Sequence, residues 1–416
     1  MKRAGIRSSD HKKETLVSVP ESNKADTPDG QGLGGQYVLR PGMPQSVVGQ
    51  RPVLGAGRLG RLLRGQGGEQ VSRTLTSLFS LCAHAHRRTA AMALAAAQSH
   101  PVAPLSPEPS VLLLIETARD HLRAIALDWP QRLPEAVPGA PNLDWLRGCP
   151  LSLATARPLT DADAAWAALA ALRVWLEQEV LHQTLAQWLA AHRHPDALAD
   201  WCMAQSARLP PARCLAAWHP VASVLTPAMR RLDLLDADLA RQTTQLHRLA
   251  QSLEDESGFA QLPTWLGRCA ETGPWARQRH QHGQAPTPHS AWTRLSARWV
   301  ELMELALTDR QNQTQGGVAP LASGALGLGD GRALAWSEMA RGLLLHWVQL
   351  APGAGVQAYR VLAPTEWNFH PEGALAHALA ALEPLDIAAA RTLAAAFDPC
   401  VAFTIQTRGS LGTADA

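Results

Sequence analysis

The sequence predicts a mainly α-helical fold with minor β structure, and three observations support this. Apolar residues recur at helical spacing through residues 71–97, and long amphipathic stretches fill much of residues 160–258. Residues typical of β-strands gather around a proline in the C-terminal stretch AYRVLAPTEWNF. The chain has 416 residues, 46% apolar and 18% charged, which is the composition of a globular protein with one large domain or two or three ordinary ones.

Residues 1–42 are predicted to form a disordered tail. All four lysines lie in the first 24 residues, and the Gly-, Asp- and Pro-rich run ADTPDGQGLGGQ follows them. No apolar signal segment begins the chain, and no stretch approaches the roughly 20 apolar residues that a membrane span needs. The formal net charge of +2 gives no electrostatic reason to expect a nucleic acid or a membrane as partner. We therefore expect a soluble, cytoplasmic protein.

Residues 43–416 are predicted to form one domain in three parts. They are an N-terminal cysteine-containing unit (43–98), a helical middle (110–310) and a C-terminal region of motifs (331–416). The six cysteines have irregular spacing, so the sequence predicts free thiols and no disulfide framework.

In the first part, one helix is predicted over residues 71–97. Its buried face is formed by Val71, Leu75, Leu78, Cys82 and Ala85, at spacings of four, three, four and three. Cys82 is therefore expected to point inward.

The middle of the chain is predicted to contain several further helices. Asp161 or Asp163 can cap a helix running through AAWAALAALRVWLEQEVLHQTLAQWLAAH. A second long amphipathic helix is predicted over residues 228–257, and another after Ala291.

Four motifs carry the chemistry. Three of them follow one another near the C-terminus: SEMARGLLLHWVQL, AYRVLAPTEWNF and AAAFDPC. The fourth, near the N-terminus, is SLCAHAHRRT. In this order they resemble the nickel–iron hydrogenase large subunits, with the patterns E-A-P-R-G-x-L-x-H, Y-x-x-x-x-P-S/T-T-W-N, D-P-C-x-x-C-x-x-H and R-I-C-G-x-C-x-x-x-H. The resemblance implies a fold like a trimmed large subunit. In it, the Cys82 helix and the Cys400 segment would meet at the centre of a helical bundle.

The departures from these patterns concern the metal ligands. Of the two cysteine pairs that hold nickel and iron in the family, the first members are present as Cys82 and Cys400. The second members are replaced by Ala85 and Phe403. Nickel in thiolate sites needs several soft anionic sulfurs, so nickel is not expected here.

The residues on the iron side are better kept. The resemblance implies that Arg341, Pro364 and Thr365 contact the cyanides of an iron-bound Fe(CN)2(CO) unit, with Cys82 and Cys400 as ligands of the iron. A cyanide nitrogen in a dry pocket needs charge-assisted or hydroxyl donors, which a guanidinium and a threonine supply. Trp367 and Asn368 are expected to fix the loop that carries Thr365.

A site that has the first cysteine of each pair and lacks the second resembles the HupK/HoxV-type maturation scaffolds of hydrogenase operons. What this implies is a non-enzymatic protein that transiently holds the Fe(CN)2(CO) unit and passes it to the apo hydrogenase large subunit. The implied partners are a small maturation chaperone and the iron–sulfur scaffold that build the unit. Two alternatives stay open: a degenerate or regulatory hydrogenase subunit that binds nickel and iron, and a metal-free structural paralogue.

Several other residues have two interpretations. His86 follows Cys82 at a spacing that can support a metal pair, but a surface or core histidine is favoured. His346 matches a motif histidine and is expected to be structural, whereas Cys149, Cys202, Cys214 and Cys269 are interpreted as ordinary thiols (none has metal-type spacing). Seven arginines against one acid between residues 43 and 98 form either a solvated basic face or a docking surface for an acidic partner or the anionic iron unit.

Overall fold

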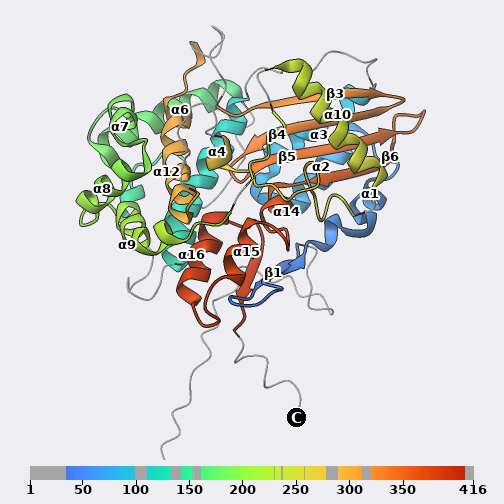
Figure 1. Ribbon diagram of the computed structural model, residues 1–416. Coiled ribbons are helices and arrows are strands. Elements are labelled where there is room, and N and C mark those ends of the chain that lie inside the picture. The colour runs from blue at the N-terminus through green and yellow to red at the C-terminus, as the bar shows by residue number, and fades with distance from the viewer. Residues whose placement is uncertain are drawn as a thin grey trace, which may run out of the picture. The chain divides into compact units, whose positions relative to one another are not determined.

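A computed structural model describes most of the chain (Figure 1). The described residues are 34–98, 110–132, 142–151, 153, 161–228, 230–235, 238–256, 258–277, 289–311 and 320–407. The prediction of a mainly α fold with minor β structure is confirmed. All six cysteines are free, as predicted. Among the described residues, no helix combines the length and the apolar character that crossing a membrane requires.

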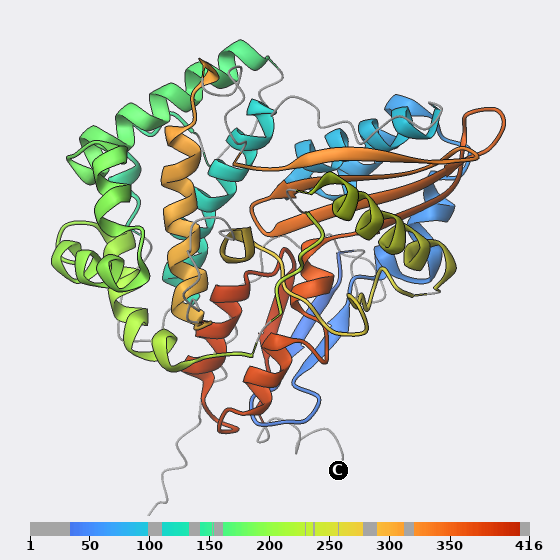
Figure 2. The same cartoon turned by 45° about the horizontal axis from the view of Figure 1, so that its top comes forward.

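One group of helices packs around α12 (Ala291–Leu307), which is buried along almost its whole length. Figure 2 shows α12, in orange, beside the green helices that form one side of this group. The helices that contact α12 are α4 (Val111–Arg123), α6 (Ala162–Trp175), α7 (Leu185–His192), α8 (Pro195–Gln205), α9 (Pro210–Val224), α11 (Pro274–Arg277) and α16 (Ile387–Phe397).

The helix limits differ in places from the prediction. Asp161 caps α6 by accepting from the backbone N–H groups of Asp163 and Ala164, as predicted. The helix predicted to continue from there ends in a π-helical turn (Leu176–Leu181), because His182 adopts a left-handed conformation. The helix predicted over 228–257 begins late, as α10 (Leu239–Asp255) with Asp238 as its cap.

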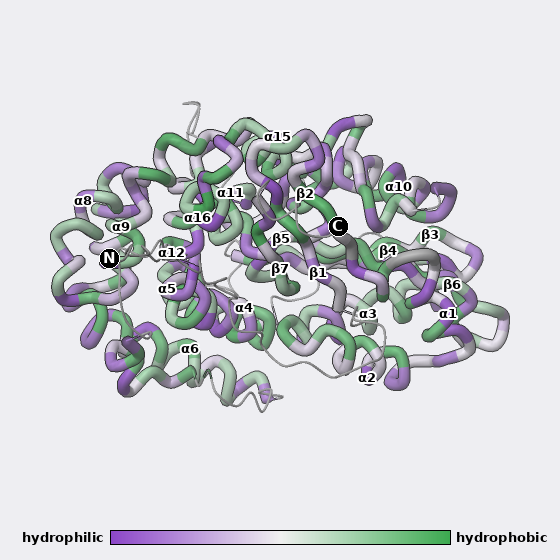
Figure 3. Tube along the Cα trace, turned by 90° about the horizontal axis from the view of Figure 1, so that it is seen from below, coloured by the Kyte–Doolittle hydropathy of each residue, from purple (hydrophilic) through white to green (hydrophobic). Residues whose placement is uncertain are grey.

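A four-stranded antiparallel sheet is the second major feature. Its strands are β3 (Ser323–Gly329), β4 (Arg332–Met339), β5 (Gly342–Leu350) and β6 (Val356–Leu362), in that order. Helix α3 (Ala83–Gln98) packs on one face, and α10 contacts the sheet together with a separate group of buried apolar residues. Figure 3 shows that polar residues, in purple, dominate α10, which buries only its inner row of Leu246, Leu249, Ala250 and Leu253.

Alternation along β4 explains how both faces are covered. Ala333 and Ala335 belong to the same apolar cluster as Ala90 and Ala93 of α3. Leu334 and Trp336, one position along, belong to the α10 cluster instead. Small side chains toward α3 allow that helix to lie close to the sheet.

The predicted helix over 71–97 is interrupted. It consists of α2 (Gly68–Leu78), a 3-10 turn (Ser80–Cys82) and α3, with Phe79 in a non-helical conformation (φ −123°, ψ 61°) between them. Because α3 packs on the sheet, the prediction that the Cys82 helix lies at the centre of a helical bundle is wrong. Apolar spacing indicated the buried face but not the partner that covers it.

The tail prediction is wrong for its last residues. Residues 36–39 form β1 (Gln36–Leu39), which pairs antiparallel with β2 (Val47–Gln50) and parallel with β7 (Ala402–Ile405). Tyr37 and Leu39 are buried there. One partner of β1, the strand β7, lies at the far end of the chain, where no local pattern in the sequence can indicate it. Residues 1–33 lie outside the described residues.

Short elements complete the fold. They are 3-10 turns at Pro52–Gly57 and Asp144–Leu146, a π-helical turn at Ala124–Asp128, and the helices α1 (Arg58–Leu63), α5 (Trp129–Arg132), α14 (Pro364–Asn368) and α15 (Ala374–Ala380).

Candidate metal-binding site

Cys400 lies just after the end of α16, in a segment anchored by Asp398. Asp398 ends the helix in a left-handed conformation (φ 44°) and is 2% exposed. Its carboxylate pairs with Arg132 at 3.0 Å, Arg298 at 2.9 Å and Arg341 at 3.1 Å. Burial alone would raise the pKa of Asp398, but the three guanidinium groups hold it well below its usual range. The backbone that presents Cys400 is therefore held by ion pairs.

The Cys400 sulfur has two polar contacts. Arg51 donates from Nη1 to Cys400 Sγ at 3.2 Å, and Thr365 Oγ1 lies 3.1 Å from the same sulfur. The other face of the Arg51 guanidinium donates from Nε and Nη2 to both carboxylate oxygens of Glu366, each at 2.5 Å. Burial lowers the pKa of Arg51, but Cys400 and Glu366 raise it by more, so the group stays charged. The sulfur thus has a guanidinium and a hydroxyl group within hydrogen-bonding distance.

Cys82, in the N-terminal part of the chain, is the other predicted ligand. It is 8% exposed, and burial raises the pKa of its thiol well above the ordinary value. Glu116 and Cys400 raise the Cys82 pKa further, whereas Arg341 lowers it. Cys82 thus has acids and a guanidinium among the groups that influence its ionisation.

Arg341 occupies the turn between β4 and β5. It is 3% exposed, donates from Nη1 to Asp120, and lies with Nε 3.1 Å from Asp398. Its ion-pair partners are thus these two acids and not the nearby Glu338, which accepts from a backbone N–H group instead. Burial lowers the Arg341 pKa, but the two acids and both cysteines raise it above the ordinary value. No hydrogen bond from Nη2 to the described residues is formed.

Thr365 is positioned by the short helix α14. Pro364 occupies the first turn of that helix, where its fixed φ suits the helix and its missing N–H group costs nothing. At the other end, the Asn368 side chain accepts from the backbone N–H group of Thr272 at 3.0 Å and donates to its carbonyl at 2.9 Å. The predicted role of Asn368 in fixing this segment agrees with these bonds.

His86 does not join the two cysteines by any hydrogen bond among the described residues. Its Nδ1 lies 3.0 Å from Nε2 of His346, whose Nδ1 lies 2.7 Å from the hydroxyl of Tyr359. The His86 ring also stacks on Phe79, with 4.0 Å between ring centroids. Burial lowers the pKa of His86 well below its ordinary value. It is a core histidine, the interpretation that the sequence favoured.

The positions of the absent ligands are filled by structural contacts. Ala85 is fully buried, and its N–H group donates to Glu116 at 2.8 Å. Phe403 lies in β7 opposite Tyr37, with the guanidinium of Arg132 above its ring at 5.5 Å. Neither side chain offers a metal ligand.

Comparison with known proteins places the chain in a family. It is 40% identical over 405 residues to the hydrogenase expression/formation protein HoxV of Cupriavidus necator, covering 91% of this chain and 97% of that protein. The chain belongs to the HoxV/HupK family of hydrogenase expression/formation proteins. The HupK protein of Rhizobium leguminosarum bv. viciae is a second relative, 33% identical over 371 residues, with 84% of this chain and 90% of that protein covered.

Two further comparisons concern family models and solved structures. No family model matches its sequence. Among solved structures, an NAD+-reducing NiFe-hydrogenase in the H2-reduced state superposes with a TM-score of 0.47 at 15% identity, covering 85% of this chain and 92% of that one.

In this HoxV/HupK-family protein, the sequence did not indicate Arg51, Glu366 or Asp120 as parts of the site. One signal was present: PTEWN has Glu366 where the large-subunit pattern has threonine. A carboxylate in that buried motif requires a cation, and Arg51 is that cation. Arg51 also belongs to the seven arginines of residues 43–98. It is buried, whereas Arg58, Arg61, Arg64 and Arg73 are exposed.

Proposed function

We propose that this hydrogenase expression/formation protein transiently holds an Fe(CN)2(CO) unit during nickel–iron hydrogenase maturation, with Cys82 and Cys400 as ligands of the iron. The observation that carries the proposal is the surroundings of Cys400. Its sulfur accepts from Nη1 of Arg51 at 3.2 Å and lies 3.1 Å from the Thr365 hydroxyl. The unit is a cargo of the protein and not a resident cofactor.

The donors near the two thiols suit the cargo. An iron that carries cyanides and two thiolates is anionic, and it needs cationic or hydroxyl neighbours in a site shielded from water. Arg341, with Nη2 not engaged by the described residues, and Thr365 supply such donors. Pro364 contributes by fixing the start of the helix that holds Thr365.

The same donor set argues against hydrogen turnover. With Ala85 and Phe403 in place of the second cysteines, the site lacks the four sulfurs of a thiolate nickel centre. We infer a non-catalytic role and expect nickel to be absent from the purified protein.

A carrier of this kind needs a donor and an acceptor. We propose that the small maturation chaperone with its iron–sulfur scaffold delivers the unit, and that the apo hydrogenase large subunit receives it, all in the cytoplasm. The exposed arginines of α1 and α2 keep two interpretations, a solvated basic face and a docking surface for these partners.

The test is infrared spectroscopy of the full chain, purified without oxygen after co-expression with the hydrogenase maturation machinery. We expect absorption bands of iron-bound CO and cyanide, with iron and without nickel. The bands should be lost in Cys82→Ala and in Cys400→Ala.

Two other cysteines provide matched controls. Cys149→Ser changes a half-buried thiol like Cys400, and Cys202→Ala changes a buried thiol like Cys82. Both should keep the bands. Bands that survive in Cys400→Ala would overturn the proposed ligand. A nickel content near one per chain would indicate a hydrogenase-like subunit, and wild-type protein without iron would indicate a metal-free paralogue.

A further inference from the structure

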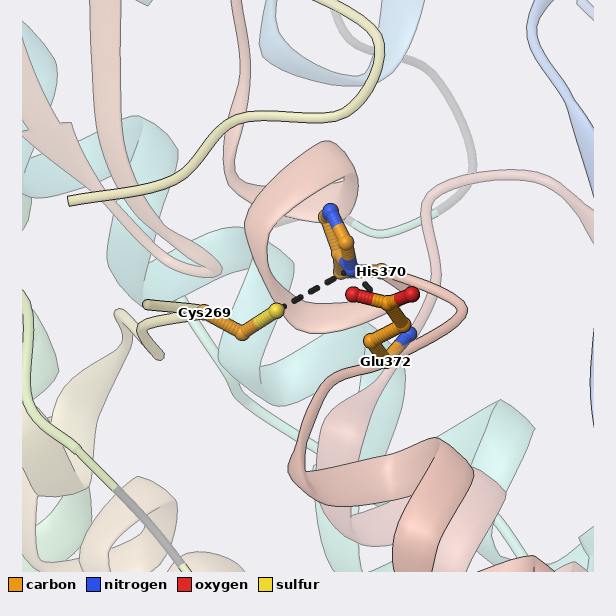
Figure 4. A group of neighbouring side chains, drawn as sticks. All are labelled: Cys269, His370 and Glu372. Carbon is orange, nitrogen blue, oxygen red and sulfur yellow. Dashed lines mark hydrogen bonds between the residues drawn. The ribbon is translucent and has the colours of Figure 1, made fainter. Parts of the chain in front are cut away.

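A second group of metal-type ligands lies outside the Cys82–Cys400 site. Cys269, His370 and Glu372 each offer one ligand atom, and these atoms all lie within 4.8 Å of one another. Figure 4 shows Cys269 coming from one loop and the other two residues from the segment that follows α14. The Cys269 sulfur and Nδ1 of His370 are 3.1 Å apart. We propose that these three residues bind a divalent transition-metal ion, as a site separate from the one that holds the iron unit.

The two segments that carry the ligands are fixed to each other without any metal. Asn368 lies two residues before His370, and Thr272 lies three residues after Cys269. The side-chain amide of Asn368 bonds the backbone of Thr272 through both its oxygen and its nitrogen. The N–H group of Gly373 donates to the carbonyl of His370 at 2.8 Å, which closes the turn that contains Glu372. The two segments are therefore held together in advance, which lowers the cost of ordering them on binding.

The burial of the three ligands differs in a way that suits an exchangeable ion. His370 is 5% exposed, Cys269 is half-buried, and Glu372 is exposed. The site is thus anchored in the protein on the imidazole side and open to water on the carboxylate side. An ion can enter from solvent and keep a water molecule in a fourth position.

The kinds of ligand select the kind of metal. A thiolate, an imidazole and a carboxylate together suit borderline ions such as Zn²⁺, Fe²⁺, Co²⁺ or Ni²⁺, whereas Mg²⁺ and Ca²⁺ prefer sites made of oxygens. In the structure, Nδ1 of His370 accepts from the N–H group of Glu372 at 3.1 Å, so this nitrogen carries a lone pair and no proton. An ion would take over that lone pair, and the thiol proton would leave to solvent.

The site is distinct from the iron site, although α14 connects them. Thr365, which contacts Cys400, lies at the start of this five-residue helix, and His370 lies two residues beyond its end. Replacing Cys269 should therefore leave the thiols at the other site unchanged. The proposal holds whether or not the iron unit is bound.

The experiment uses the full chain with Cys82→Ser and Cys400→Ser, so that the two central thiols cannot bind the probe. Titration with Co²⁺ without oxygen should give thiolate-to-cobalt charge-transfer absorption that saturates at about one ion per chain. Further replacement by Cys269→Ser should abolish this absorption. His370→Gln should weaken Co²⁺ binding by at least about tenfold, because a ligand is lost from an ordered site.

Cys149→Ser in the same background is the matched control, because Cys149 is also half-buried but bonds only the carbonyl of Leu151. It should bind Co²⁺ normally. Charge-transfer absorption that persists in Cys269→Ser, or no such absorption in the starting protein, would overturn the proposal. Circular dichroism of each variant checks that the fold is intact. The infrared bands of the iron unit should persist in Cys269→Ser. A failed Co²⁺ titration would then count against the second metal site alone and leave the iron proposal standing.

Discussion

Cys82 and Cys400 have different surroundings. Around Cys400, Arg51 donates to the sulfur and is itself paired with Glu366. The Thr365 hydroxyl lies 3.1 Å from the same sulfur. Around Cys82, burial and the neighbouring Glu116 both raise the pKa of the thiol. Cys400 thus has charged and hydrogen-bonding neighbours, whereas the surroundings of Cys82 favour its neutral thiol. We call the surroundings of Cys400 the ionic half of the site and those of Cys82 the neutral half.

The ionic half should be the more sensitive to loss of one charge. Glu366→Gln leaves the Arg51 guanidinium buried without its carboxylate, and we expect the free energy of unfolding to fall by about 3–5 kcal/mol. Replacing both partners, as Arg51→Met with Glu366→Met, should cost less than the single change because no buried charge is left unpaired. Urea unfolding of the three proteins measures both values.

The exposed pair of Arg310 and Asp163 is a matched control, since both side chains are more than half exposed. Asp163→Asn should change stability by about 0–1 kcal/mol. If Glu366→Gln were as mild as Asp163→Asn, the Arg51–Glu366 pair would not hold the Cys400 half together, and the contrast between the two halves would fail.

The residues that the sequence predicted for this site differ in a physical way from the contacts that it did not indicate. Cys82, Arg341, Thr365 and Cys400 lie in short motifs whose residues are neighbours along the chain, so a pattern can locate them. Arg51 and Glu366 are 315 residues apart, and no periodicity connects them. Their pairing is a product of tertiary structure.

A different reason explains why most of the four-stranded sheet was missed, although β-type residues were recognised in the stretch that forms β6. Strands β4 and β5 are buried on both faces, so GLLLHWVQL is an almost continuous apolar run without the alternation that marks a half-exposed strand. Among the helices around α12, those predicted from the sequence are α6, α7 and α12 itself, and each has a capping side chain, from Asp161, Thr184 and Ser290 respectively. The ligand group of Cys269, His370 and Glu372 was missed because Cys269 is about a hundred residues from the other two.

The neutral half should respond to pH through Glu116. Burial raises the pKa of Glu116 to about 7, although two backbone N–H groups, of His84 and Ala85, lower it. Because this folded-state pKa lies above the ordinary value, the folded protein binds more protons than the unfolded chain between the two values. Stability should therefore fall as pH rises from about 4.5 to about 7, and stay at the lower level above that.

The size of this fall is about 2 kcal/mol, since Glu116 keeps partial contact with solvent. Glu116→Gln cannot ionise, so the difference in unfolding free energy between this variant and the wild type should change by that amount between pH 5 and pH 8. Comparing the two proteins at each pH cancels the buried histidines. A difference that does not vary with pH would mean that Glu116 is not held in its neutral form.

The smallest expected effect concerns the hydrogen bonds that connect His86, His346 and Tyr359. Tyr359→Phe removes the hydroxyl that bonds His346 and leaves a buried ring nitrogen without a partner, which should cost about 1–2 kcal/mol. Tyr37→Phe is the control, because Tyr37 is similarly buried but its hydroxyl makes no hydrogen bond to the described residues. Thermal unfolding should separate the two variants. If they were equally stable, the chain from His86 to Tyr359 would contribute only packing, and the neutral half would depend on apolar burial alone.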